Sequence, residues 1–262
     1  MVGPIGSNDP IPVRAQIPHG GPMAEARHEW IAEQLRGDIL RGAYPAGVRL
    51  PAERQLAQRL GANRSSVREA LRTLEQSGLV EIRHGGGATV QPLRQASLDV
   101  IQHLLVLDGV VNRPLLEQVL EVHEMLIVEA ARLAVEHASG EQAKEARALL
   151  AVAADPATAD DDYIDAIEAL LSLIAESSGN LVLLMARRAV NPLFQGSFRE
   201  ARKRFRAPHE VIAAFTEALG VAIETRDADL AALTVRRFIR AGRSRALDAL
   251  EEITRPAGDD PR

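Results

Sequence analysis

The fold is decided by residues 50–71, which read LPAERQLAQRLGANRSSVREAL. Apolar side chains recur three and four positions apart within residues 56–60 and again within residues 67–74, which is the spacing of one helix face. A glycine turn separates the two runs, and Asn63 or Ser65 offers a side-chain oxygen that can cap the second helix. The stretch therefore predicts two helices joined by a tight turn.

The first turns of the second helix carry the polar side chains of Arg64, Ser65, Ser66 and Arg68. A recognition helix inserts this end into the major groove, where an arginine can bind O6 and N7 of guanine with two hydrogen bonds. Hydroxyl groups and the amides of a helix N-terminus also suit phosphate oxygens, so each of these residues can contact either a base or the DNA backbone. We interpret the helix pair as a DNA-binding head.

Two short β-prone runs follow, at residues 79–83 and 88–90, on either side of a tip formed by His84, Gly85 and Gly86. They predict a two-stranded wing whose tip can lie close to a minor groove. The alternative is an ordinary helical hairpin with a solvated charged face, since a helix-turn-helix pattern alone is common.

The distribution of charge favours the DNA-binding interpretation. From Arg27 to Arg94 there are eleven arginines, no lysine and seven acidic residues, which gives +4 in a chain whose total is −5. The rest of the chain therefore carries −9. The basic part is the one expected to meet phosphate.

This part of the chain resembles the winged helix-turn-helix of the GntR family of transcription regulators. The resemblance spans roughly residues 28–91 and rests on ILRGAYPAGVRLPAER at 39–54, NRSSVREAL at 63–71 and the glycine-rich wing. It implies a bacterial regulator whose homodimer binds a palindromic operator in double-stranded DNA. Carried over by position, it also implies DNA contacts from Arg54, Asn63, Arg64, Ser65, Ser66, Arg68, His84, Gly85 and Gly86.

The remaining sequence predicts a mainly α protein in which the winged head is joined to an all-helical domain of about seven helices. Proline and glycine density marks the arm and the linker, and helix start and stop signals divide the second domain, with Pro192 expected to kink or break its fifth helix. The predicted parts are a flexible arm at 1–22, the winged helix-turn-helix at 23–91, a linker at 92–96, a ligand-binding and dimerisation domain at 97–254 and a flexible tail at 255–262. The predicted helices of the second domain lie near 97–108, 113–138, 140–154, 159–178, 180–205, 208–225 and 227–250.

Composition and motifs argue against several other classes of protein. The 262 residues include no cysteine, which excludes disulfides and thiolate chemistry, and no apolar run approaches the roughly 18 residues that span a bilayer. There is no Gly-x-Ser-x-Gly nucleophile motif, and the His-Glu pairs at 123–124 and 209–210 lack the second histidine of a zinc protease. We expect a cytoplasmic protein with no catalytic residues, no cofactor and no membrane partner.

The helical domain is similar to the effector domain of the FadR subgroup, with Ser177-Ser178-Gly179-Asn180 at that subgroup's Ser-Gly-Asn break. Many such domains hold a metal through an Asp and a His four residues apart and two later histidines. The corresponding positions here include Ile167, Leu171 and Phe238, which cannot ligate a metal. The resemblance therefore predicts no metal site, and TVRRF at 234–238 is similar to the members that respond to long-chain acyl-CoA or fatty acid.

Four polar residues on otherwise apolar helical stripes are candidates for the effector site: His123, Arg187, Asn191 and Arg237. A buried imidazole needs a polar partner, so His123 is either a core histidine bonded to a neighbour or a group that meets an anionic effector. The arginines are either in buried or exposed ion pairs or hold a carboxylate or phosphate.

These features predict a regulator that an acyl-CoA or fatty acid releases from its operator. A regulator that senses a small carboxylic acid remains a second possibility. A third is a ligand-binding scaffold in which the DNA-binding head is vestigial.

Overall fold

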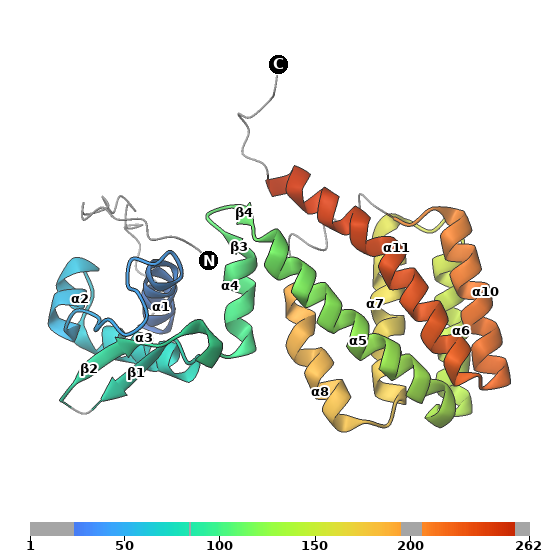
Figure 1. Cartoon of the computed structure of the whole chain (residues 1–262), viewed down its shortest axis with the longest axis horizontal. Coiled ribbons are helices and arrows are strands. Elements are labelled where there is room, and N and C mark those ends of the chain that lie inside the picture. The colour runs from blue at the N-terminus through green and yellow to red at the C-terminus, as the bar shows by residue number, and fades with distance from the viewer. Residues whose placement is uncertain (1–23, 84, 195–205, 255–262) are drawn as a thin grey trace, which may run out of the picture.

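The computed structural model describes residues 24–83, 85–194 and 206–254. They form a small head and a larger helical domain, with a short connecting segment between the two (Figure 1). The head consists of α1 (Ala24–Leu40), α2 (Glu53–Arg59), α3 (Arg64–Gln76), β1 (Val80–Arg83) and β2 (Gly87–Val90). The arm predicted at 1–22 and the tail predicted at 255–262 lie outside the described residues.

The head has one apolar core beneath its helix pair. Ile31 and Leu35 of α1 are fully buried against Leu56 of α2 and against Val67 and Leu74 of α3, as the helical spacing predicts. Burying a side chain of this size stabilises the fold by roughly 1.5–3 kcal/mol. Because α2 and α3 both pack against α1, their positions relative to each other are fixed.

A glycine ends α3 and brings the following strand back to the core. Gly78 has φ of +70°, and a methyl group at this position would lie 2.5 Å from the carbonyl oxygen of Gln95. The conformation and the close approach of backbone both require glycine. The chain can then enter β1, which pairs with β2 in antiparallel register from Val80–Val90 to Arg83–Gly87.

The connecting segment differs from the helix predicted at 97–108. It contains two short 3₁₀ turns, η1 (Leu93–Gln95) and η2 (Leu98–Val100), then α4 (Ile101–Leu105) and a small hairpin of β3 (Val106–Leu107) and β4 (Val110–Val111). Asp108 and Gly109 turn the hairpin with φ of +54° and +78°. Positive φ at both positions is the pattern of a tight Asp-Gly turn, and it overrides the apolar spacing that favoured a longer helix.

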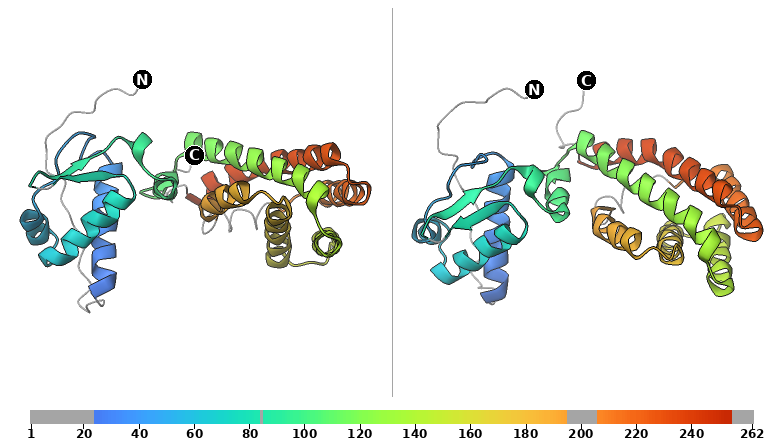
Figure 2. Two further views of the ribbon diagram at one scale, coloured as in Figure 1. Left: turned by 90° about the horizontal axis from the view of Figure 1, so that it is seen from below. Right: turned by 60° about the horizontal axis from the view of Figure 1, so that its bottom comes forward.

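The helical domain is built around two long antiparallel neighbours, α5 (Arg113–His137) and α11 (Ala228–Thr254), which run side by side in every view (Figures 1 and 2). The predicted helix at 180–205 ends early, because Pro192 follows α8 and the chain continues as η3. Residues 195–205 lie outside the description. The other elements are α6 (Gly140–Ala154), α7 (Asp160–Ser177), α8 (Leu181–Val190), η3 (Asn191–Phe194) and α10 (His209–Thr225). Among the described helices, none combines the length and apolar character that a membrane crossing requires.

Candidate nucleic-acid interface and effector domain

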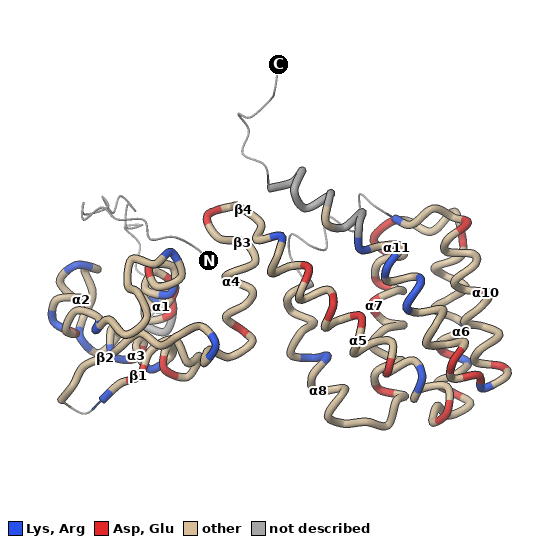
Figure 3. The backbone as a smooth tube through the Cα atoms, viewed as in Figure 1, with Lys and Arg blue, Asp and Glu red and all other residues tan. Residues whose placement is uncertain are grey.

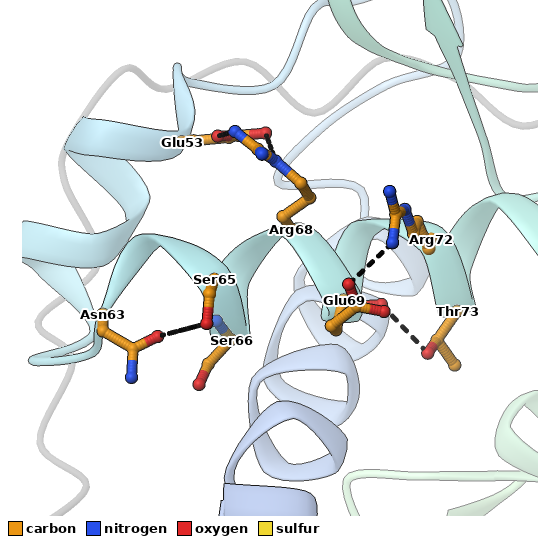
Figure 4. Close-up of polar contacts among 8 residues, drawn as sticks. All are labelled: Glu53, Asn63, Ser65, Ser66, Arg68, Glu69, Arg72 and Thr73. Atoms are coloured by element: carbon orange, nitrogen blue, oxygen red, sulfur yellow. Dashed lines mark hydrogen bonds and ion pairs between the residues drawn. The ribbon is translucent and has the colours of Figure 1, made fainter.

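The N-terminus of α3 presents its polar residues around a side-chain cap. The carboxamide oxygen of Asn63 accepts a hydrogen bond of 2.7 Å from the backbone N–H of Ser66, and Ser65 Oγ donates to the same oxygen at 3.3 Å (Figure 4). This cap satisfies a backbone donor that a helix start otherwise leaves free. Asn63 therefore fixes the direction in which the next residues point.

Arg68, one turn further along α3, is held by Glu53 at the start of α2. Its Nε and Nη2 donate to the two carboxylate oxygens of Glu53 at 3.0 and 2.8 Å (Figure 4). The hydrogen bond from Arg68 is the main cause that lowers the pKa of Glu53 below its ordinary value, and burial opposes it. The same contact raises the pKa of Arg68. The carboxylate is thus ionised at neutral pH and locks the arginine to the neighbouring helix.

This contact leaves one edge of the Arg68 guanidinium open. Arginine has five N–H donors, of which Glu53 occupies one on Nε and one on Nη2. The remaining donors on Nη1 and Nη2 form the end-on fork that can bind a guanine with two hydrogen bonds. Glu53 was not singled out by the sequence analysis, because nothing in a spacing of fifteen residues shows that the two side chains meet.

The structure places most of the predicted DNA contacts on the surface of the head. Arg54, Asn63, Arg64, Ser65 and Arg68 are exposed, and Arg54 and Arg64 form no ion pair with any described residue. Figure 3 shows arginines along α2 and at the end of β1, on the side of the head that is far from the helical domain. We refer to the surface that carries the exposed Arg54, Arg64 and Arg68 as the basic face.

Ser66 and the wing tip differ from these exposed helix residues. Ser66 is only 6% exposed, because its position on α3 turns it toward the core, so its hydroxyl is not presented to the surface. At the wing tip, Gly85 is exposed with φ of +72° and Gly86 is half-buried. His84 lies outside the described residues.

In the helical domain, the predicted effector residues divide into two groups. His123 of α5 is 9% exposed and Arg187 of α8 is 4% exposed, and these two helices pack against each other. Asn191 caps the end of α8 and is half-buried. The burial of His123 confirms the face predicted for α5.

Arg237 does not join this group. It is exposed, because the buried face of α11 contains Ala231, Thr234 and Val235. The predicted stripe followed Leu230, Leu233, Arg237 and Arg240 instead. A buried charge on α5 was also missed: Glu124 is 8% exposed and accepts a hydrogen bond of 2.7 Å from Nε of Arg240. Arg240 belongs to the same predicted stripe as Arg237, but a separation of 116 residues gives no sign that it meets Glu124.

A small apolar pocket with a cavity volume of about 50 Å³, partly open to solvent, lies between α5, α6, α7 and α10. The pocket exists because the side chains that α5 and α6 direct toward it are mostly small alanines. Leucines and isoleucines of α7 and α10 line the rest of it. Two polar groups stand out: Ser177, whose buried Oγ has no hydrogen-bond partner among the described atoms, and Arg226, whose Nη1 donates to the carbonyl oxygen of Glu136 at 3.2 Å. The lining suits a ligand with an apolar body.

The positions at which related domains hold a metal are packed with apolar side chains. Ile167 and Leu171 are 2% and 5% exposed in the core of the domain. Phe238 stacks on Phe215 with ring centroids 4.0 Å apart. These side chains offer no donor to a cation, and among the described residues no three His, Asp or Glu side chains converge on a point that could hold one.

Polar contacts join the connecting segment to the head. Nε of Arg41, just after α1, donates to both carboxylate oxygens of Asp108 in the hairpin turn at 2.9 and 3.0 Å. Nδ1 of His103 on α4 lies 3.4 Å from a carboxylate oxygen of Glu33 on α1. Burial, followed by the charge of Arg36, lowers the pKa of His103, so the imidazole is neutral at pH 7.

A winged head joined to a helical domain defines the class of two-domain winged-helix regulatory proteins. Residues 27–90 match the model of the bacterial regulatory proteins of the gntR family, and residues 118–241 match the FCD domain. The chain belongs to the GntR family, in the branch that carries an FCD effector domain.

Three curated relatives are similar to this chain to different extents. The HTH-type transcriptional regulator Rv0494 of Mycobacterium tuberculosis is 31% identical over 86% of this chain and 91% of its own length. The L-lactate dehydrogenase operon regulatory protein of Escherichia coli is 31% identical over 71% and 72%. The fatty acid metabolism regulator protein of Pasteurella multocida is 34% identical over 39% of each chain. For two further mycobacterial HTH-type regulators, the match spans about half of their length, 49%.

Proposed function

We propose that this protein is an effector-controlled transcription regulator that binds a palindromic operator as a homodimer. The observation that carries the proposal is the exposed N-terminus of α3, where Arg64 has no ion pair with a described residue and Arg68 keeps an open fork of donors. Both groups stand at the end of a helix that a winged head inserts into the major groove.

The contacts have different roles in this proposal. Arg64 and Arg68 bind base edges, because only a planar fork at the helix N-terminus can pair with guanine in two places. Arg54, Asn63 and Ser65 bind phosphate oxygens and fix the register of the head. Gly85 and Gly86 let the wing tip approach the minor groove closely, and His84 is a further proposed contact.

For the effector, we propose a long-chain acyl-CoA or fatty acid, with His123, Arg187 and Asn191 near its polar end. Support comes from the apolar side chains at three positions where related domains ligate a metal and from the relative named for fatty acid metabolism. The second candidate is a small carboxylic acid, which is favoured by the lactate operon relative, since its match covers more of both chains.

The effector would act through the connecting segment. Val100 is buried in the core of the head, and Leu105, five residues later, is buried in the core that α5 and α8 share with η3. A shift of α5 or α8 on ligand binding therefore moves a segment that is packed into both parts. In a dimer, such a shift changes the spacing of the two heads.

A thermal-shift screen of the full chain tests the effector assignment. A ligand at a hundredfold its dissociation constant adds about 2.7 kcal/mol to the stability, which is a clear rise in melting temperature. Stabilisation by palmitoyl-CoA or palmitate, with release of the protein from DNA by the same compound, is the expected result. Stabilisation by lactate or another short acid alone overturns the lipid assignment and leaves the DNA-binding assignment intact.

A further inference from the structure

The segment at 47–50 lies along the wing and is joined to it by an isolated β-bridge. It runs antiparallel to β2 along the edge that β1 leaves free, joined by three backbone hydrogen bonds of 2.8–2.9 Å, and Arg49 pairs with Thr89. Residues directly opposite each other on adjacent strands share a face of the sheet. Arg49 and Thr89 therefore lie on the outer face, since the side chains of β2 that alternate with Thr89 point into the core.

On this face, the side chain of Arg49 extends toward the wing tip. A methyl group placed on Gly87 would lie 3.5 Å from Cδ and 3.9 Å from Nε of Arg49, so the aliphatic stem crosses over the bare backbone of that glycine. Gly87 is two residues nearer the tip than Thr89 and is paired with Arg83 of β1. The guanidinium of Arg49 is thus carried from the base of the wing toward its outer end.

The charge of Arg49 is not neutralised by a neighbour. Arg36, Arg41, Arg59, Arg68, Arg72 and Arg83 of the head each have a carboxylate within ion-pair distance. Arg49 is exposed and has no such partner in the described part of the chain. A guanidinium in this state can bind a phosphate without first breaking an ion pair.

We infer that Arg49 is a further DNA-binding residue, which binds a backbone phosphate beside the groove that the wing tip enters. The inference rests on the proposed function, because it assumes that the head binds DNA. Arg49 lies in the segment before α2 and not in the hairpin of β1 and β2, yet its positive charge lies beside the wing. A phosphate contact strengthens binding to every sequence and leaves the preference between sequences unchanged.

The test measures the affinity of the full chain for a fluorescein-labelled duplex of arbitrary sequence by anisotropy, across a series of salt concentrations. The variant Arg49→Gln keeps a stem that can lie over Gly87 and removes the charge, whereas Arg49→Lys keeps the charge. The control is Arg94→Ala. Arg94 is also exposed and without an ion pair to a described residue, but η1 places it beside Gly78 at the opposite end of α3.

We expect Arg49→Gln to reduce the slope of log affinity against log salt by about 0.9 for each bound head and to weaken binding about eightfold per head near 0.1 M salt. Arg49→Lys should keep most of the slope, and Arg94→Ala should match the wild type. An unchanged slope in Arg49→Gln, or an equal loss in Arg94→Ala, overturns the inference. Failure of the wild-type chain to bind any duplex overturns the proposed function instead.

Discussion

Replacing Arg68 with alanine should remove sequence preference more than affinity. Arg68 keeps the end-on fork of its guanidinium free while Glu53 holds the other edge with bonds of 3.0 and 2.8 Å, so the fork is already oriented before DNA arrives. A bidentate arginine–guanine pair discriminates against a wrong base by roughly 5- to 150-fold. For a dimer with two heads, the preference for the operator over a scrambled duplex should fall by at least about 30-fold.

The assay compares two duplexes by anisotropy: a site selected from a random pool by the wild-type chain and a scrambled version of it. Arg68→Ala should bring the two affinities together, while its affinity for the scrambled duplex should change little. Arg59→Ala serves as the matched control. It removes another exposed and ion-paired arginine, bound to Asp38 at 2.7 Å, and should leave the ratio of affinities unchanged. A ratio in Arg68→Ala equal to that of the wild type would refute the reasoning.

The same geometry gives a second expectation for Glu53. In Glu53→Ala, the guanidinium of Arg68 loses its anchor and the basic face loses a negative charge. Affinity for the scrambled duplex should therefore rise, and the preference for the selected site should fall by less than in Arg68→Ala. If Glu53→Ala lowered binding to the scrambled duplex, the anchoring role assigned to this carboxylate would be wrong.

Three further predictions concern stability and coupling. Gly78→Ala should destabilise the head by more than the roughly 1–2 kcal/mol that a left-handed residue costs, because the new methyl group also meets the carbonyl of Gln95. Urea unfolding measures this loss of stability, and an unchanged unfolding midpoint would contradict the prediction. His103 has a lowered pKa in the folded state, so its contribution to stability is present above its unfolded pKa of about 6.5 and is lost as the pH falls below that value. The melting temperatures at pH 7.5 and pH 5.5 should therefore differ less in His103→Gln than in the wild type. If both proteins showed the same difference, His103 would not be a source of the pH dependence of stability. Leu104→Ala should weaken effector-induced release from DNA more than Arg41→Ala does, as measured by effector titration of the DNA complex.

The helix-turn-helix and the wing could be predicted because their signals are local. The polar cap at Asn63, the glycine after α3 and the periodicity of residues 56–74 all act within one or two turns, and the resemblance then supplied the candidate DNA contacts. The hairpin at 106–111 also had a local signal, an Asp-Gly pair between the apolar pairs Val106-Leu107 and Val110-Val111. It was missed because the apolar spacing before it favoured a helix.

The contacts that join distant segments could not be predicted in the same way. The pairs Arg68–Glu53, Arg41–Asp108 and Arg240–Glu124 are separated by 15, 67 and 116 residues, and each partner has other charged residues nearer in the chain. For Arg237, the error was in the helix face, since α11 offers arginines on several faces and the apolar stripe alone did not decide between them. Packing against α5 and α10 determines which face of α11 is buried.

The size of the coupling that regulation requires limits which contacts can supply it. A hundredfold change in operator affinity corresponds to about 2.7 kcal/mol of coupling free energy. The Arg41–Asp108 pair is 46% and 57% exposed, and exposed pairs of this kind contribute about 0–1 kcal/mol and less at high salt. The apolar side chains of the connecting segment offer more, since burying a single leucine or valine stabilises by about 1.5–3 kcal/mol. Val100 and Leu104 pack in the head while Ile101 and Leu105 pack in the helical domain, so one turn of helix cannot shift toward one core without withdrawing from the other. In the proposed mechanism, the packing of α4, and not the exposed ion pair, therefore carries the energy that links effector to DNA.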